Sequence, residues 1–330
     1  MEKIVNWGVL GAGRIAHKFV QDLLTLPNAR LHAVASTSAD RAADFARQYG
    51  APHAYGSYDG LLTCPDLHVV YVATPHHGHA ENTVMLLENG IPVLCEKPLA
   101  INGRQVAAML DASKRHQTYL MEALWTRFLP TTQKVLELVE SGAIGKLQTL
   151  RADFGFRKDF DPTNRVFDPK QGGGSLLDVG IYPIFLSMIL LGKPKTIEAT
   201  ARLMPSGVDE SCAMLFGYES GALAILDSGI TMVTPCEAYL HGSEGTLKIH
   251  SRWHEPSSGL TLTRYDSSEP QFLPFERECI GYRYEAEAVM ADLAAGRTEN
   301  ALVSRRFSRE LMEIMDAVRA KAGIFYEGID

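Results

Sequence analysis

The first third of the chain alternates short apolar runs with longer stretches in which apolar residues recur every three or four positions. The runs predict buried strands, and the longer stretches predict amphipathic helices. Strands are predicted at residues 4–10, 31–35, 69–73, 92–95 and 119–121, and helices at 15–26, 38–49, 79–88 and 103–116. Because apolar strands alternate with helices, we expect a doubly wound parallel sheet covered on both faces.

The pattern changes after residue 129, where strand-like runs follow one another without helices between them. Polar turns such as Glu219-Ser220-Gly221 and Ser243-Glu244-Gly245 separate the runs, which predicts a mostly antiparallel sheet. The predicted strands are 147–156, 196–203, 211–218, 222–227, 236–241, 246–250 and 260–265, and the helices are 131–140, 176–191, 284–295 and 304–320. The fold class is therefore α/β, with the parallel sheet in residues 1–122 and an α+β domain in residues 123–330.

Composition narrows the class of protein without changing this architecture. With 330 residues, 46% hydrophobic and 22% charged, the chain is long enough for two domains that each have a core. The net charge of −7 disfavours nucleic acid and anionic membranes as partners. The N-terminus lacks the pattern of a signal peptide, and the longest apolar run, residues 181–191, contains Pro183 and is expected to be a buried helix.

The cysteines are odd in number, and none of them forms a C-x-x-C pair. This pattern favours free thiols in a reduced, cytoplasmic protein. The cysteines are Cys64, Cys95, Cys212, Cys236 and Cys279.

A glycine-rich segment, residues 11–16, follows the first predicted strand and opens the first predicted helix. In such a segment Gly11 permits the tight turn, and Gly13 lets a pyrophosphate approach the backbone. The N–H groups of Arg14 and Ile15 then lie at the positive end of the helix, which favours phosphate. The context predicts a dinucleotide-binding (Rossmann) domain over residues 1–122, and a glycine-rich turn without a ligand is the alternative.

The cofactor is predicted from the end of the second strand, where Ser36 and Thr37 stand in place of an acidic residue. An NAD-selective site usually carries Asp or Glu there to bind the ribose 2′-hydroxyl. Hydroxyls can donate to a 2′-phosphate, and Arg41 follows one helical turn later, so we expect NADP, with NAD possible. The alternative is that Ser38 only caps the next helix and Arg41 is solvated.

Lys97 lies in the tetrapeptide Cys95-Glu96-Lys97-Pro98, directly after a predicted strand. Ligands bind at the carboxyl ends of parallel strands, so this ammonium is a candidate to hydrogen-bond a substrate oxygen during hydride transfer. Glu96 is expected to be structural rather than chemical. The alternative is a solvated surface lysine.

A second pair of candidate catalytic residues, Asp178 and Tyr182, follows the glycine run 172–174. Residues four apart share one face of an α-helix. A phenol has a reference pKa near 10, and a neighbouring Lys97 ammonium would favour the phenolate, so Tyr182 is the predicted proton carrier. Asp178 is expected to orient either group. A helix cap and a core tyrosine are the alternative.

Histidines 76, 77 and 79 do not have the spacing of a common zinc site, so we expect no metal. A loop on the cofactor side of the sheet, with His79 starting the next helix, explains them better. Several large side chains are either core residues or part of a substrate pocket. These candidates are Trp125, Arg127, Phe154, Phe156 and Trp253.

Taken together, these motifs resemble the Gfo/Idh/MocA family of nicotinamide-dependent oxidoreductases. The resemblance covers essentially the whole chain and rests on the glycine loop, Thr74-Pro75 with His79, Glu96-Lys97-Pro98, and residues 172–180. Tyr182 replaces the histidine of many members. That difference, with residues 121–128 and 281–287, resembles the branch containing dimeric dihydrodiol dehydrogenases and NADP-linked sugar dehydrogenases.

The resemblance implies cofactor contacts from Thr74, Pro75, His76, His79 and Glu96, in addition to Lys97. It implies a Lys97/Tyr182 pair, NADP preference, and a homodimer formed through the open sheet of the second domain. That domain, residues 123–330, would bind substrate and mediate oligomerisation. The expected activity is hydride transfer between NAD(P) and a sugar, polyol or trans-dihydrodiol carbon. The alternative is a non-catalytic dinucleotide-binding sensor on the same fold.

Overall fold

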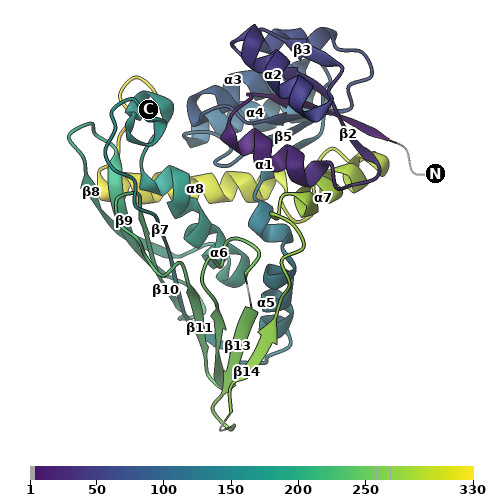
Figure 1. The fold of residues 1–330 in the computed structure, drawn as a ribbon. Helices are drawn as coiled ribbons and strands as arrows, with labels where there is room; N and C mark the ends of the chain where they lie inside the picture. Colours follow the sequence, from purple (N-terminus) through teal and green to yellow (C-terminus); the bar gives the residue numbers. More distant parts are fainter. Residues whose placement is uncertain (1–3, 258, 268) are drawn as a thin grey trace. The chain divides into compact units, whose positions relative to one another are not determined.

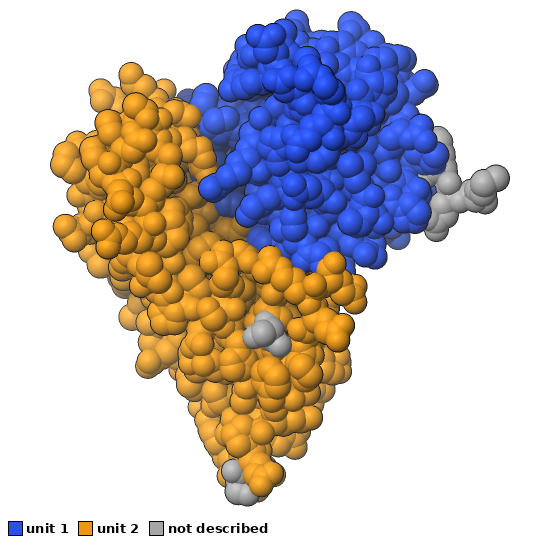
Figure 2. All heavy atoms as spheres, viewed as in Figure 1, with its two compact units in different colours: residues 1–125, 279–309 blue, residues 126–278, 310–330 orange. Residues whose placement is uncertain are grey.

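The computed structural model describes residues 4–257, 259–267 and 269–330. The chain forms two compact units, coloured separately in Figure 2. Unit 1 comprises residues 1–125 and 279–309, and unit 2 comprises residues 126–278 and 310–330. The sequence-based boundary near residue 122 lies close to the first crossing between units. That division did not anticipate that residues 279–309 belong with the first unit.

Unit 1 contains a parallel six-stranded sheet in the order β3-β2-β1-β4-β5-β6 (Figure 1). This strand order is that of a doubly wound dinucleotide-binding sheet, which confirms the predicted fold class. The strands are β1 Val5–Leu10, β2 Ala29–Ala35, β3 His53–Tyr55, β4 Val69–Val72, β5 Val93–Glu96 and β6 Leu120–Ala123. The helices are α1 Arg14–Leu23, α2 Ala39–Tyr49, α3 His79–Glu88, α4 Gly103–Arg115 and α7 Arg283–Ala294.

The centre of unit 1 is an aromatic core. Trp7, Phe19 and Tyr71 are fully buried, and the rings of Phe19 and Tyr71 stack with centroids 3.8 Å apart. β4 and β5 are buried along their whole length, as expected for strands covered on both faces. The edge strand β3, which the sequence pattern did not predict, has only three residues, and none of them is fully buried.

Helix α7 joins unit 1 through a buried carboxylate. Asp22, near the end of α1, accepts hydrogen bonds from the backbone N–H groups of four consecutive residues, 280–283, at the start of α7. The helix has no side-chain cap of its own. A carboxylate at this end of a helix accepts hydrogen bonds from N–H groups that have no partner within the helix, and the helix dipole favours it. A residue 258 positions upstream therefore fixes where α7 packs.

Unit 2 is built on an eight-stranded sheet in the order β14-β13-β12-β11-β7-β10-β9-β8. All neighbouring strands are antiparallel except β7 and β10. The strands are β7 Leu147–Gly155, β8 Thr196–Leu203, β9 Asp209–Gly217, β10 Leu223–Gly229, β11 Ala238–Gly242, β12 Gly245–Ile249, β13 Gly259–Arg264 and β14 Gln271–Pro274. β14, largely exposed, is the second strand that the sequence pattern did not predict.

The two faces of this sheet differ. Helix α6 (Ile181–Leu191) packs against β7 and β10 on one face, and its residues 181–188 are all buried. Side chains alternate between the two faces of a strand. On the other face, Leu215 of β9 and Leu223 and Ile225 of β10 are each more than 40% exposed. Leu215 and Ile225 are paired across the two strands, so the exposed apolar side chains form one patch.

The remaining helices of unit 2 are α5 (Pro130–Glu140) and the larger part of α8 (Arg305–Ala322). By length and composition, the segment Pro169–Leu191 would be able to cross a membrane. However, 83% of its most apolar window is buried inside the protein, as expected for a core helix.

Candidate functional site

The glycine loop after β1 has the conformation that a dinucleotide-binding turn requires. Gly11 has φ of +103°, and a Cβ at this position would lie 2.8 Å from the carbonyl oxygen of Ala73. Only glycine fits this close approach of the β1 and β4 ends. Gly13, the residue before α1, is exposed, and a Cβ there would meet nothing within 4 Å.

The N-terminus of α1 fits an anionic group. No side chain caps the helix, and its first turn contains no acidic residue. Arg14 is exposed and Ile15 is partly exposed, while Ala16 is fully buried. Uncapped N–H groups at the positive end of a helix, next to open space over Gly13, are what a pyrophosphate needs. The residues present therefore fit a dinucleotide.

At the end of β2, the helix cap considered from the sequence is present. Ser38 caps α2, because its hydroxyl accepts a hydrogen bond from the Arg41 N–H at 3.3 Å. The Arg41 guanidinium donates to the Thr37 hydroxyl at 2.8 Å, and both side chains are exposed. Ser36 is buried, and its hydroxyl accepts from the Ser38 N–H at 3.4 Å. Thr37 and Arg41 are thus the side chains at this strand end that are accessible to a ligand.

His79, the first residue of α3, connects two backbone segments. Its Nδ1 lies 2.8 Å from the carbonyl oxygen of Pro98, and its Nε2 lies 2.9 Å from that of Thr74. Carbonyl oxygens only accept, so a neutral ring satisfies one of them and an imidazolium satisfies both. His79 is fully buried and holds the loop that follows β4 against the loop that follows β5.

The neighbours of His79 are partly accessible to a ligand. Pro75 has intermediate exposure, and His76 is buried with its ring centroid 5.6 Å from that of His79. The Thr74 hydroxyl is buried and has no hydrogen-bond partner among the described residues. An unsatisfied buried hydroxyl next to the glycine loop is a position where a bound cofactor can supply the missing partner.

Lys97 lies at the end of β5 beside two buried carboxyls. Glu96 accepts a hydrogen bond from the Tyr71 hydroxyl and another from the backbone N–H of Lys97. Glu122, at the end of the adjacent β6, accepts from the Leu99 N–H at 2.8 Å. Burial raises the pKa of Glu122 to about 7, and the charge of Lys97 acts against that increase. Glu96 thus has two contacts within unit 1, and Glu122 is a neighbour of the lysine that the sequence argument missed.

In unit 2, Tyr182 lies in an aromatic cluster. It is 6% exposed, and its ring centroid is 5.3 Å from those of Phe154 and His254. Phe154 and His254 stack on each other at 3.7 Å. His254 was not predicted, because an isolated histidine in a polar loop carries no periodic signal. Its backbone carbonyl, which accepts from the Thr126 hydroxyl at 2.7 Å, helps to hold it there.

Asp178 lies in a π-helical turn, Leu176–Gly180, that precedes α6. The prediction that Asp178 and Tyr182 share a helix face assumed α-helical geometry, so the spacing argument does not hold across this turn. The Asp178 carboxylate instead accepts from the Arg165 guanidinium at 3.0 Å. Arg165 is, after Glu122 and His254, a third residue that the sequence argument missed.

The other substrate-pocket candidates divide into two groups. Trp125 stacks on Tyr282 in unit 1, and Trp253 is 1% exposed and donates its indole N–H to the backbone of Asp153, so both have core roles. Phe156 is partly exposed. Arg127 has a buried Nη1 without a hydrogen-bond partner among the described residues. Burial lowers the pKa of Arg127, and the unsatisfied donor makes it a candidate for binding a ligand oxygen.

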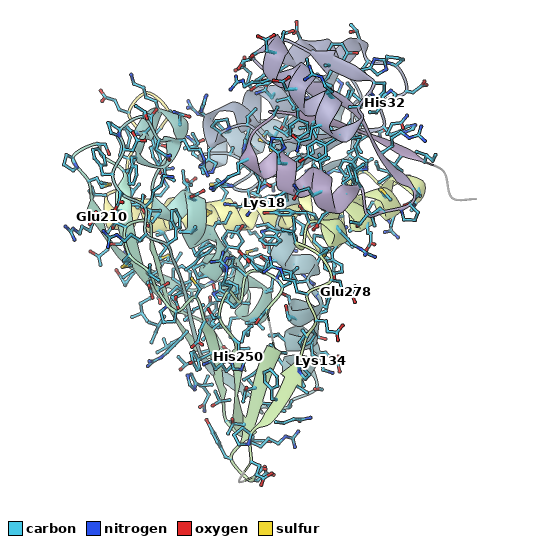
Figure 3. All side chains as sticks on the ribbon, in the orientation of Figure 1. Lys18, His32, Lys134, Glu210, His250 and Glu278 are labelled. Carbon is cyan, nitrogen blue, oxygen red and sulfur yellow. The ribbon has the colours of Figure 1, made fainter. Side chains whose placement is uncertain are left out.

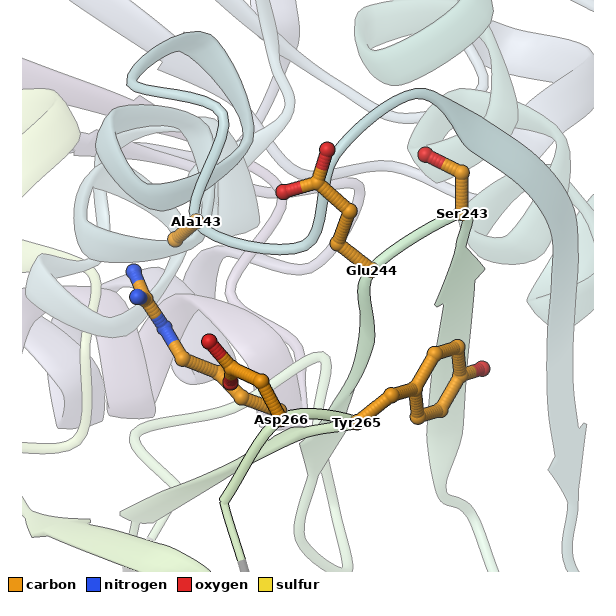
Figure 4. A pocket seen from close by; sticks show the side chains of 6 residues that line it. Ala143, Ser243, Glu244, Tyr265 and Asp266 are labelled. Carbon is orange, nitrogen blue, oxygen red and sulfur yellow. The ribbon is translucent and has the colours of Figure 1, made fainter.

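A separate cavity of about 410 Å³ lies in unit 2 near the hairpin ends of the sheet (Figure 4). None of the predicted site residues lines it. Its lining residues are Ala143, Ser243, Glu244, Arg264, Tyr265 and Asp266.

Two protein-family models match the chain. Residues 5–124 match an oxidoreductase family with an NAD-binding Rossmann fold, and residues 132–248 match the GFO/IDH/MocA C-terminal domain. Among relatives, trans-1,2-dihydrobenzene-1,2-diol dehydrogenase of Danio rerio is 37% identical, and the alignment covers 98% of each chain. The Homo sapiens protein of the same name is 31% identical with the same coverage.

Solved structures of similar fold include the 3-ketoreductase KijD10 from Actinomadura kijaniata in complex with NADP and TDP-benzene. It is 26% identical with a TM-score of 0.87, over 97% of this chain and 98% of that one. An aldose-aldose oxidoreductase from Caulobacter crescentus is 24% identical with a TM-score of 0.89, over 97% and 98% of the two chains. This second likeness shows the fold alone.

The loop that leads to Asp178 and Tyr182 depends on Asp209. Its Oδ2 accepts from the Ser175 hydroxyl and the Leu176 N–H, both at 2.7 Å. Gly174 has φ of +106°, and a Cβ there would lie 2.2 Å from Oδ1 of Asp209. Burial raises the pKa of Asp209 from 3.8 to about 6.

A raised pKa means that the folded state binds the proton more tightly than the unfolded state. The contribution of Asp209 to stability is therefore complete below about pH 4 and is lost as the pH rises through 6. We expect the free energy of unfolding of wild type to fall relative to Asp209→Asn by about 3 kcal/mol between pH 4 and 7. Urea unfolding at several pH values measures this difference. A pH-independent difference between wild type and Asp209→Asn would contradict the prediction.

Proposed function

We propose that this chain, which belongs to the Gfo/Idh/MocA family of oxidoreductases, is an NADP-preferring dehydrogenase or reductase acting on a CH–OH group of a diol or sugar. The observation that carries the proposal is Lys97. It lies at the carboxyl end of β5 in a sheet whose glycine loop fits a dinucleotide. A protein that only bound the cofactor would not need a lysine there.

The relatives support the substrate class. The two dehydrogenases described above are named for a trans-dihydrodiol, and KijD10 is a ketoreductase bound to NADP. Variants of KijD10 with a lysine replaced by Ala or Glu, and with a tyrosine replaced by Phe, have also been crystallised. The same two residue types are the catalytic candidates in this chain.

The bound nicotinamide would supply the acceptor for the hydride. Lys97 would hydrogen-bond the substrate hydroxyl and stabilise the negative charge that develops on its oxygen. Tyr182 would take the proton from that hydroxyl in oxidation and return it in reduction. Asp178, oriented by Arg165, would help to position these groups, and Arg127 with Phe154 and Phe156 would contact the rest of the substrate.

The proposal is tested by nicotinamide absorbance across a panel of trans-dihydrodiols, aldoses and polyols. We expect turnover of at least one vicinal diol or sugar with NADP. Lys97→Met should lower kcat/KM sharply with cofactor affinity nearly unchanged, and Tyr182→Phe should lose about 10²–10⁴-fold in rate. Lys114→Met and Tyr265→Phe, at exposed positions, are the matched controls. Tight cofactor binding without turnover on any substrate would support a sensor instead.

Cofactor preference follows from the exposed pair Thr37 and Arg41. A charge-assisted hydrogen bond from Arg41 to a 2′-phosphate contributes roughly 1.5–3 kcal/mol, so we expect NADP to be preferred about 10–100-fold in kcat/KM. Arg41→Ala should remove most of this preference, and Thr37→Asp, which places a carboxylate at the exposed position, should shift it towards NAD. Arg47→Ala, on the same helix but paired with Asp44, should leave the ratio unchanged. Equal kcat/KM for both cofactors in wild type would refute this assignment.

We further propose a cytoplasmic homodimer formed through the exposed face of the unit 2 sheet. The patch of Leu215, Leu223 and Ile225 supports it, because an apolar sheet face of this kind typically marks an interface. Light scattering should give twice the 36.3 kDa chain mass. Ile225→Glu should shift the protein to monomer, and Phe325→Glu, at another exposed apolar position, should not. A monomeric wild type at micromolar concentration would contradict this.

A further inference from the structure

Three side chains with metal-binding atoms come together in unit 1, and none of them is assigned to the reaction. They are His32 of β2, His53 of β3, and Cys64, which follows the 3₁₀ turn Tyr58–Thr63. One ligand atom from each lies within 4.8 Å of the other two. All three side chains are partly exposed, so an ion can reach them from solvent. Figure 3 marks the position of His32.

The surroundings of His32 prepare it for coordination. Its Nε2 lies 2.9 Å from the carbonyl oxygen of Pro65. Because a carbonyl only accepts, the ring donates through Nε2, which leaves Nδ1 as the unprotonated nitrogen of the neutral imidazole. Metal-binding histidines typically have such a backbone carbonyl on the second ring nitrogen, where it fixes the tautomer and the ring orientation.

His53 and Cys64 lie next to the His32 ring and to the backbone carbonyl that it contacts. The His53 ring lies edge-on to that of His32, with centroids 4.8 Å apart. The Cys64 thiol donates to the Pro65 carbonyl at 3.6 Å, and the His32 ring contacts the same carbonyl. Coordination would release the thiol proton, because a metal binds the thiolate form of cysteine.

We propose that His32, His53 and Cys64 bind a divalent transition-metal ion of borderline softness, such as Zn²⁺, with water as the fourth ligand. Zinc takes imidazole nitrogen and thiolate sulfur at about 2.0–2.3 Å in a tetrahedral arrangement, so its ligand atoms are about 3.5 Å apart. The three atoms here lie within 4.8 Å of one another, so they need to move closer by at most about 1.3 Å, which partly exposed side chains achieve by small rotamer changes.

The bound ion would stabilise the edge of the unit 1 sheet. β3 is a three-residue edge strand, and β2 pairs with it at only three positions. Coordination would join the two strands and the turn before Cys64 through one centre. The same strands continue to Ser36, whose N–H donates to the Tyr55 carbonyl at 3.1 Å. An ion that binds the folded chain alone raises its stability by mass action.

Cobalt titration of the full-length, chelator-treated protein tests the site. We expect one Co²⁺ per chain and a near-ultraviolet charge-transfer band, which reports a thiolate on the metal. Cys64→Ser should abolish the band, and Cys279→Ser, at another partly exposed cysteine, should retain it. His53→Gln should weaken Co²⁺ binding at least about 10-fold, since even the loss of an outer-shell partner costs this much.

A second measurement excludes a folding artefact in the variants. Added Zn²⁺ should raise the Tm of wild type and Cys279→Ser, but not of Cys64→Ser, while all three give the same circular dichroism spectrum without metal. The proposal is overturned if Co²⁺ binds without a thiolate band, if the band persists in Cys64→Ser, or if wild type binds no metal at one equivalent.

Discussion

The arrangement of unit 1 depends on the close contact between the backbone ends of β1 and β4. Gly11 lies against Ala73 so closely that any side chain would collide with the carbonyl oxygen. The Gly11 N–H donates to the Ala35 carbonyl at 2.9 Å, and the Ala73 N–H donates to the Leu10 carbonyl at 2.8 Å. These hydrogen bonds keep the ends of β1, β2 and β4 next to one another. The glycine loop, the hydroxyls after β2 and the Thr74 loop consequently share one edge of the sheet.

A buried histidine, His79, holds the loop that contains Lys97 at the same edge of the sheet. His79 contacts the carbonyl oxygens of Thr74 and Pro98, which joins the β4 loop to the loop that contains Lys97. Glu96 and Glu122, both buried, then accept backbone N–H groups on either side of Pro98. Unit 2 uses the same device, since the buried Asp209 holds the loop that leads to Asp178 and Tyr182. In both units, buried polar groups determine where the loops next to the candidate catalytic residues lie.

The amphipathic pattern along the chain predicted most elements to within a few residues, and Ser38, considered there as a cap, caps α2. The two missed strands, β3 and β14, are three and four residues long and lie at sheet edges. Too few of their side chains are buried to produce an alternating pattern. The π-helical turn at Asp178 was missed for a related reason, because one inserted residue barely alters the apolar spacing around it.

The sequence by itself determined the fold class and the family. Local signals carried both: apolar periodicity, the glycine loop, and the residues next to Lys97 and Tyr182. Only the tertiary structure placed Asp22 at the start of α7, Glu122 near Lys97, and His254 on Phe154. The same holds for His32, His53 and Cys64, whose spacing matches no metal-binding motif. Periodicity depends on neighbours along the chain, whereas these contacts join residues far apart in sequence, so they exist only once the strands and helices have packed.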